Sequence, residues 1–175
     1  GRGSHAAMPE AVRDPIVIAT ALVQHLQTIV SRNLKPTQSV VLSVTRIAAG
    51  SAYNVIPETA EIAGTVRYFD DAAAELTSAR MREIAAGLAA AHGAEIELDI
   101  RNVFDVLVND HALSDAMAAE ARGIVGAARA GLKGDVVMGS EDFADMLRVV
   151  PGAYCTIGHK GDVPLHNPAF VFDDD

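Results

Sequence analysis

Residues 61–69, Glu61-Ile62-Ala63-Gly64-Thr65-Val66-Arg67-Tyr68-Phe69, alternate between two sets of side chains. Val66 belongs to the mainly apolar set, whereas Thr65 and Arg67 belong to the mainly polar set. Successive side chains of a β-strand point to opposite faces of the sheet. The run therefore predicts a strand that places Thr65 and Arg67 on one face and Val66 on the other.

The segments around this strand predict the rest of a small α+β domain. Asp14-Pro15 predicts the start of a helix, and the β-branched residues 40–49 predict a strand. Asp70-Asp71 predicts a second helix that Gly93 ends, and residues 95–101 alternate like a strand. The order is helix, strand, strand, helix, strand. One more strand before Gly1 would complete a βαββαβ, ferredoxin-like unit, so the sheet is expected to lack its first strand.

The composition changes after residue 103, and a domain boundary is predicted near residue 105. Asp110 predicts the N-cap of a third helix, and residues 136–138 and 153–158 are short apolar runs that predict strands. Ser140 is expected to cap a further helix that runs to about Val149, with Glu141 and Asp142 in its first turn.

Charge and composition exclude several classes of function. The chain has a formal net charge of -9 at pH 7, which argues against binding to nucleic-acid phosphates or to anionic membranes. It contains no run of eighteen apolar residues that would predict a transmembrane helix. Cys155 is the only cysteine, so no intrachain disulfide forms. This usage fits a reducing cytoplasm, which is the location we expect.

Five polar residues are candidates for chemistry, and each has an ordinary structural alternative. His166 is either a surface histidine or a metal ligand through a neutral imidazole nitrogen. Glu141 is either a first-turn carboxylate or part of a site, and the ordinary interpretation of Asn54 is a turn residue. The ordinary interpretation of Arg67 is a solvated strand residue, and His5 is expected to be exposed. Spacing alone does not create a metal site here.

Two blocks of motifs then fall into one pattern. The first block comprises Gly1-Arg2-Gly3-Ser4-His5-Ala6-Ala7-Met8-Pro9, Asp14-Pro15-Ile16, Asn54-Val55-Ile56-Pro57 and Gly64-Thr65-Val66-Arg67. The second block comprises Met138-Gly139-Ser140-Glu141-Asp142-Phe143-Ala144, Pro151-Gly152-Ala153-Tyr154, Ile157-Gly158 and Leu165-His166-Asn167-Pro168. Together they resemble the metal-dependent amidohydrolase branch of the aminoacylase and carboxypeptidase superfamily, which includes hippurate hydrolases.

The resemblance implies a two-part architecture. Residues 1–105 would be the ferredoxin-like satellite domain that mediates homodimerisation. Residues 106–175 would be the C-terminal part of a di-metal aminopeptidase-like α/β sandwich. It also implies that Gly3-Ser4-His5 is native sequence and not the remnant of a tag.

Roles for single residues follow from the same resemblance. His166 matches a histidine that ligates one metal, and His5 matches a satellite histidine that stabilises the tetrahedral oxyanion in the partner's active site. Asn54 and Arg67 match residues that hold the substrate, including its carboxylate. Glu141 matches a position beside the metal site that supports the ligands without being one of them.

The family's remaining metal ligands and its general base are expected to lie outside this chain. They belong to a Cys-Gly-His-Asp type motif and a Glu-Glu pair, neither of which occurs in the sequence. The complete protein would use two divalent ions, zinc or manganese, to activate a water that attacks the amide of an N-acyl amino acid. This chain would hold an incomplete site and would be inactive by itself.

Two other classes of function remain as alternatives. A ferredoxin-like unit can serve as a non-enzymatic dimerisation or ligand-binding module. RNA binding is disfavoured because the chain is acidic and residues 95–101 offer no aromatic side chains on which bases would stack.

Overall fold

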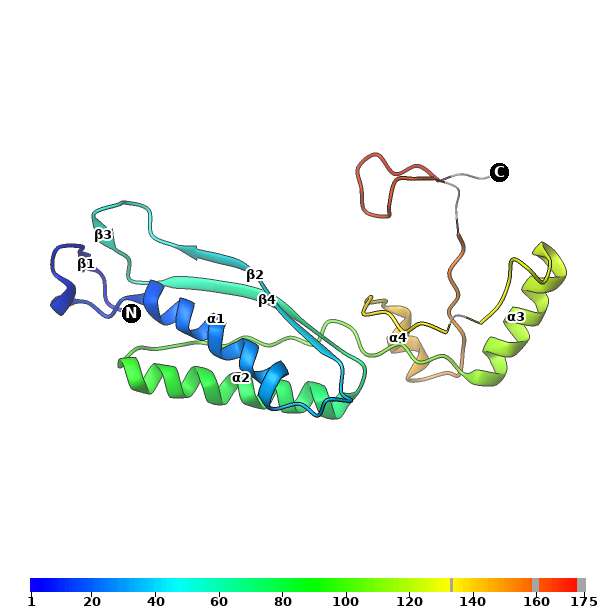
Figure 1. Ribbon diagram of the computed structural model, residues 1–175, viewed down its shortest axis with the longest axis horizontal. Coiled ribbons are helices and arrows are strands. Elements are labelled where there is room, and N and C mark those ends of the chain that lie inside the picture. Colours follow the sequence, from blue (N-terminus) through cyan, green and yellow to red (C-terminus); the bar gives the residue numbers. More distant parts are fainter. Residues whose placement is uncertain (133, 159–160, 173–175) are drawn as a thin grey trace. The chain divides into compact units, whose positions relative to one another are not determined.

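The computed structural model describes residues 1–132, 134–158 and 161–172. Its internal contacts divide the chain into two compact units. Unit 1 comprises Gly1–Val106 and Val136–Ser140, and unit 2 comprises the described residues of Leu107–Asp135 and Glu141–Asp175. Figure 1 labels the elements of both units. Within the described ranges, the helices are too short or too polar to cross a membrane.

Two long helices of unit 1 begin and end where the sequence predicts. Helix α1 spans Pro15–Arg32, and the Asp14 carboxylate caps it by accepting a hydrogen bond from the Ile16 amide at 2.8 Å. Helix α2 spans Asp71–His92, and the Asp70 carboxylate accepts from the Ala73 amide at 2.8 Å. Gly93 ends α2 with a left-handed φ of 58°, a conformation that glycine adopts without steric cost.

Strands β2 (Val40–Ala49) and β4 (Ala60–Tyr68) form an antiparallel hairpin, also as predicted. Leu42 lies opposite Val66, and Val41 lies opposite Arg67. Val66 packs against the core, so Arg67 lies on the opposite face, which confirms the predicted alternation. A β-bulge interrupts the hairpin between Val44 and Arg46 and leaves Thr45 without a partner residue in β4.

Gly64 is required at the bulge because β2 approaches it closely. A Cβ atom built on Gly64 would lie 2.2 Å from the Ser43 carbonyl oxygen and 3.1 Å from the Val44 Cα. Both neighbours are backbone atoms, which cannot move away by changing rotamer. The Gly-Thr-Val-Arg motif therefore contains glycine for a steric reason.

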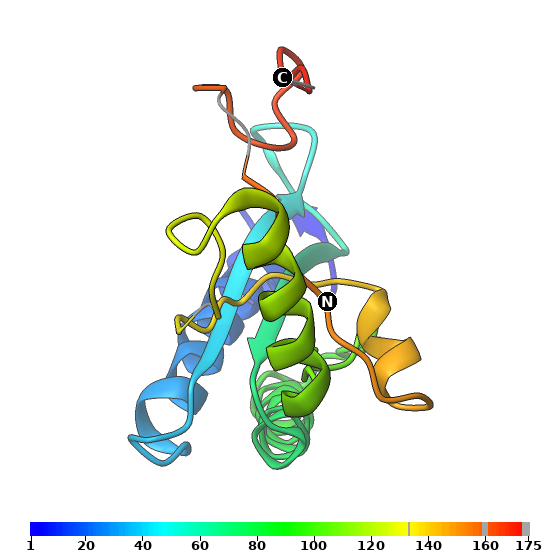
Figure 2. The same cartoon turned by 90° about the vertical axis from the view of Figure 1, so that its right-hand side faces the viewer.

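The core of unit 1 lies between the two helices and the hairpin. Figure 1 shows α1 and α2 on the same side of β2 and β4, and Figure 2 views α2 almost along its axis. The central buried residues are Leu22, Leu26, Ile29 and Leu42. Partly buried residues of β4 and α2 pack around them, including Ile62, Val66, Met81, Ile84 and Leu88. Burial of such side chains is the main favourable contribution to folding.

The strand predicted over residues 95–101 is wrong. The described part of the chain contains only two ladders, β1–β3 and β2–β4, and neither includes this segment. The segment nevertheless alternates between half-buried and exposed positions, and Ile96 packs against the core. The apolar pattern thus predicts the buried face correctly. A strand also needs hydrogen bonds to a neighbouring backbone, and neither of the two ladders includes these residues.

Unit 2 contains the helices α3 (His111–Val125) and α4 (Phe143–Leu147). The Asp110 carboxylate caps α3 by accepting from the Leu113 amide at 2.9 Å, as predicted. The Ser140 cap is wrong because α4 begins later, with Asp142 at its N-cap. The Asp142 side chain makes no capping hydrogen bond.

The short strands predicted over residues 136–138 and 153–158 are also wrong. Side-chain hydrogen bonds from Asn109 replace the expected ladder at Tyr154. The Tyr154 amide donates to Asn109 Oδ1 at 2.8 Å, and Asn109 Nδ2 donates to the Tyr154 carbonyl at 3.0 Å. One amide side chain therefore satisfies both backbone groups that a neighbouring strand would otherwise pair.

Candidate functional site

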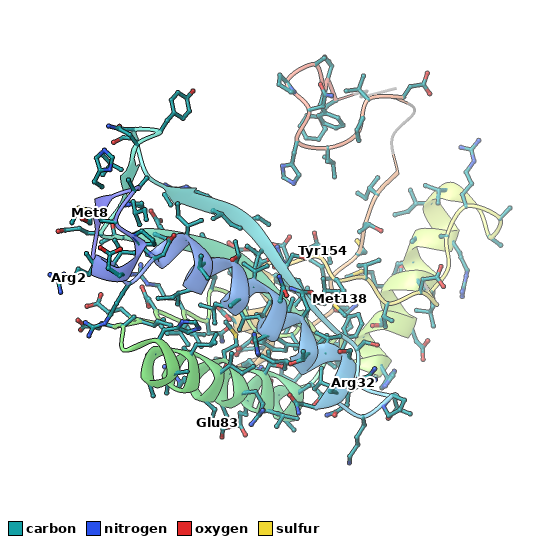
Figure 3. The ribbon with its side chains drawn as sticks, turned by 60° about the vertical axis from the view of Figure 1, so that its left-hand side comes forward. Arg2, Met8, Arg32, Glu83, Met138 and Tyr154 are labelled. Atoms are coloured by element: carbon teal, nitrogen blue, oxygen red, sulfur yellow. The ribbon has the colours of Figure 1, made fainter. Side chains whose placement is uncertain are left out.

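A small two-stranded sheet brings two of the predicted residues together. Strand β1 (Ser4–His5) pairs antiparallel with β3 (Val55–Ile56), and His5 lies opposite Val55. The Ala6 amide then donates to the Asn54 carbonyl at 2.9 Å. His5 and Asn54 are therefore neighbours although 48 residues lie between them in the sequence. Arg2 and Met8, labelled in Figure 3, mark this end of unit 1.

Close backbone contacts fix the segment that carries His5. A Cβ atom on Gly3 would lie 2.6 Å from the Ile56 carbonyl oxygen, and one on Gly1 would lie 2.5 Å from that of Arg13. The backbones of Arg2 and Arg13 also exchange two hydrogen bonds of 3.0 Å. Both glycines are thus needed for close approach, which explains the Gly-x-Gly spacing before the histidine.

The His5 ring is exposed but takes part in local hydrogen bonding. The Ala7 amide donates to His5 Nδ1 at 3.1 Å, and the Met8 amide donates to the His5 carbonyl at 2.9 Å. The second bond closes a turn over residues 5–8. Sequence periodicity gave no sign of β1 or of this turn, because two residues are too few to show an alternation.

Arg67 does not join His5 and Asn54 within unit 1. It is half-buried in β4, seven residues beyond Ala60, where the strand begins. Seven residues of strand span roughly 23 Å, so Arg67 lies toward the far end of β4. Among the described residues, no salt bridge involves its guanidinium group.

In unit 2, Glu141 belongs to a group of three interacting side chains. Its Oε2 accepts a hydrogen bond from the Tyr154 hydroxyl at 3.0 Å, and Phe143 packs against the Tyr154 ring with centroids 5.9 Å apart. Hydrogen bonds from Asp142 and then from Tyr154 lower the pKa of Glu141. The same contacts raise the pKa of Asp142 and of Tyr154, because the Glu141 carboxylate favours their protonated forms.

Sequence reasoning did not select Tyr154 as a functional residue. The motif Pro151-Gly152-Ala153-Tyr154 was visible in the sequence, but a tyrosine within an apolar run is most simply a packing residue. Its partner Glu141 lies on a separate segment, and only the fold brings the two together.

His166 occupies an unusual backbone conformation. Its φ is 69°, and it is the third residue of a turn closed by the Asn167 amide, which donates to the Pro164 carbonyl at 3.2 Å. Glycine or asparagine normally occupies this position, and a histidine there carries a local conformational cost. The Asn167 side chain supports the loop by accepting from the Ala169 amide at 2.9 Å. His166 lies in a loop, as the sequence predicts, and it is exposed.

The described residues do not form a metal site by themselves. Within those ranges, no group of three His, Cys, Asp or Glu side chains lies close enough to hold an ion. A catalytic zinc site uses three protein ligands, and His166 could supply only one of them. Unit 2 also has an open apolar groove of about 640 Å³ along α4 and residues 149–152, but none of the five candidate residues lines it.

The family model described as "Peptidase dimerisation domain" matches residues 1–95. An N-acetylcysteine deacetylase of Bacillus subtilis is 38% identical over 100% of this chain and 45% of its own length. A hippurate hydrolase of Campylobacter jejuni is 35% identical over 99% of the chain and 45% of its own length. The chain thus spans about half the length of the curated relatives it matches.

A solved structure supports the same assignment. A Bacillus subtilis protein described as a dinuclear metal-binding peptidase from the M20 family is 34% identical and matches with a TM-score of 0.71, over 91% of this chain and 41% of that one. The family model covers more than half of the chain, and the relatives cover nearly all of it. The chain therefore belongs to the M20 peptidase family and contains its dimerisation domain.

Proposed function

We propose that this chain is part of a metal-dependent amidohydrolase that removes the acyl group from N-acyl amino acids, including hippurate-like substrates. The observation that carries the proposal is the β1–β3 ladder, which fixes His5 beside Asn54 on an exposed end of unit 1. The names of two relatives, an N-acetylcysteine deacetylase and a hippurate hydrolase, support the reaction class.

Each candidate residue has a role in this proposal. His5 donates a hydrogen bond to the oxyanion that forms when the amide carbon is attacked, a contribution that ranks among the larger catalytic effects. Asn54 lies next to it and orients the substrate. Arg67 pairs with the substrate carboxylate. Arg67 lies far along β4 from His5 and Asn54. Arg67 therefore serves a different active site of the dimer from His5 and Asn54, or the three residues act in different states of one site.

The metal site requires residues beyond those described. We propose that His166 is one ligand and that Glu141, held by Tyr154, supports the site from outside the direct ligands. The left-handed φ of His166 supports a functional role, since costly conformations concentrate at functional sites. Two divalent ions, zinc or manganese, would bind in the complete protein; the dinuclear description of the structural relative supports that number.

We further propose that residues 1–105 are the satellite domain, residues 106–175 belong to the catalytic domain, and unit 1 forms a homodimer. The match to a dimerisation domain supports the dimer. The single cysteine supports a cytoplasmic location. Sedimentation of the chain at micromolar concentration tests the assembly: a dimer is expected, and a monomer at all concentrations contradicts it.

The decisive experiment uses the complete gene product that contains this chain. Hydrolysis of N-acetyl amino acids and hippurate is measured after loading with zinc or manganese. His5→Ala is expected to lower kcat by about 10²–10³-fold with a small change in KM, as for loss of one oxyanion donor. His92→Ala, an exposed histidine in the last turn of α2, is the matched control and should leave kcat unchanged.

Two outcomes would overturn the proposal. One is a complete gene product that binds no metal and cleaves none of these amides, which would favour the alternative of a dimerisation or ligand-binding module. The other is equal activity of His5→Ala and wild type. Turnover by the 175-residue chain alone would contradict the narrower prediction that it is inactive by itself.

A further inference from the structure

We propose that the backbone amide of Ala7 fixes the His5 imidazole as the neutral tautomer that carries its proton on Nε2. The inference rests on the proposed role of His5 and specifies how that residue is prepared for it. The Ala7 amide lies 3.1 Å from His5 Nδ1. A backbone N–H can only donate, so the ring nitrogen that faces it must present a lone pair. The remaining proton of the neutral ring is then on Nε2.

The fold holds the amide and the ring in one small hydrogen-bonded turn. The Met8 amide closes the turn onto the His5 carbonyl at 2.9 Å, and the Ala6 amide ties it to the Asn54 carbonyl at 2.9 Å. The tight contact between Gly3 and Ile56 fixes the strand that enters the turn. The Ala7 amide is thus held by its neighbours whether or not the ring is present.

A second histidine in unit 1 is held in the opposite way. His25 Nδ1 lies 2.8 Å from the Ala21 carbonyl oxygen, one turn earlier on α1. A carbonyl oxygen can only accept, so His25 Nδ1 must carry a proton. The same chain therefore contains two histidines whose Nδ1 atoms face partners of opposite kind, and their neutral tautomers should differ.

The consequence for His5 is a fixed hydrogen-bond donor. The exposed Nε2–H points away from the amide that engages Nδ1, so it is free to meet an oxygen that develops negative charge. No rotation or proton transfer is needed when that charge forms, which is the advantage of a preorganised donor. Ala7 acts through His5 and touches no substrate, so its amide is a positioning group.

The test is a long-range ¹H–¹⁵N spectrum of the ¹⁵N-labelled 175-residue chain in mildly alkaline buffer, where exposed imidazoles are neutral. His5→Gln and His25→Gln assign the two rings. We expect His5 with a bare Nδ1 and a protonated Nε2, and His25 with the reverse. The exposed His92 shows the tautomer mixture of an unconstrained ring. A His5 ring that matches His92, or that carries its proton on Nδ1, overturns the inference.

Two proline variants in the same turn identify the cause. Ala7→Pro removes the amide that faces His5 Nδ1, and the His5 signals should move toward the mixture of His92. Ala6→Pro removes instead the hydrogen bond to the Asn54 carbonyl and should leave the His5 tautomer unchanged. Unaltered His25 signals show that unit 1 remains folded in each variant.

A pure Nε2–H tautomer in folded Ala7→Pro would show that the amide is not the cause. If Ala7→Pro prevents folding, the wild-type comparison of His5 with His25 and His92 still decides which tautomer His5 adopts, and a mixture like that of His92 overturns the inference. None of these readouts depends on amide hydrolysis, so failure of the tautomer inference and failure of the proposed function are distinguishable.

Discussion

Unit 1 and unit 2 differ most in where their apolar side chains lie. In unit 1, Ile29 is fully buried and Leu26 and Leu42 are 5% and 7% exposed. In the described part of unit 2, the buried apolar residues are two alanines, Ala118 and Ala144. Unit 1 encloses its core with elements drawn from residues 15–96, whereas the helices of unit 2 leave their apolar faces open.

Helix α3 shows what this difference teaches. Its apolar residues recur at helical spacing, yet Leu113 is 43% exposed and Ile124 is 84% exposed. An amphipathic pattern indicates that one face of a helix is suited to burial, but it does not indicate which segment covers that face. We therefore expect unit 2 by itself to associate or to lose order, because exposed apolar surface of this kind favours association.

The largest expected effect comes from removing a core side chain. Ile29→Ala should lower the free energy of unfolding of unit 1 by about 2–5 kcal/mol, because it removes buried methyl groups and leaves a cavity. Ile124→Ala is the matched substitution in unit 2 and should change stability by less than about 0.5 kcal/mol. Hydrogen exchange of the amides in α1 and in α3 measures the two effects separately.

This comparison can fail in a specific way. If Ile124→Ala destabilises α3 as strongly as Ile29→Ala destabilises α1, then unit 2 packs that face in solution. The contrast between the two units would then be wrong.

A pair of glycine substitutions sharpens the account of unit 1. Gly64→Ala should destabilise unit 1 by about 1–3 kcal/mol, because the new Cβ would overlap the backbone of β2. Gly87→Ala, on the exposed side of α2 with nothing within 4 Å of the new Cβ, should stabilise it by about 0.5–1 kcal/mol. Urea denaturation followed by circular dichroism reads both changes. A neutral Gly64→Ala would mean that the bulge relaxes freely.

The smallest effect concerns the Tyr154–Glu141 contact of unit 2. The pKa of Tyr154 is raised by its hydrogen bond to Glu141, so the contact favours the protonated phenol. Its contribution is fully present below the ordinary tyrosine pKa of about 10 and is lost as pH rises through the higher folded value. Tyrosinate absorbance of wild type minus that of Tyr154→Phe isolates this titration.

Glu141→Gln is the control for that titration. It keeps an acceptor oxygen but removes the charge, so Tyr154 should titrate closer to the ordinary value. Identical titration curves of Tyr154 in wild type and Glu141→Gln would show that the contact does not form in solution.

Local signals predict helix caps and the β2–β4 hairpin better than they predict the pairing of the other expected strands, for a physical reason. The caps at Asp14 and Asp70, the left-handed Gly93 and the alternation around Val66 are each determined within a few residues, and the structure confirms them. Residues 95–101 fail as a strand because pairing depends on a neighbour that no local pattern specifies. The predicted start of α4 is wrong because its N-cap is Asp142, two residues after Ser140, and no side-chain hydrogen bond marks that position.

For the candidate site, too, the sequence identifies residues but not the contacts between them. The sequence identified His5 and Asn54 through resemblance, but only the β1–β3 ladder shows that they are neighbours. Two further contacts depend on how the backbone turns: that of Tyr154 with Glu141, and that of the Ala7 amide with His5. Backbone turns leave no periodic signal in the sequence.

The bulge at Thr45 means that the alternation along β2 runs in two frames. Before it, Leu42 and Val44 point to the helices, so the even positions are inside. After it, Arg46 lies opposite Ala63 and forms a 2.9 Å salt bridge with Glu61 on the outer face, so the even positions are outside. Deleting this one residue would exchange the two faces for the half of the strand that leads to Asn54. Any redesign of the hairpin must therefore count positions separately on each side of residue 45.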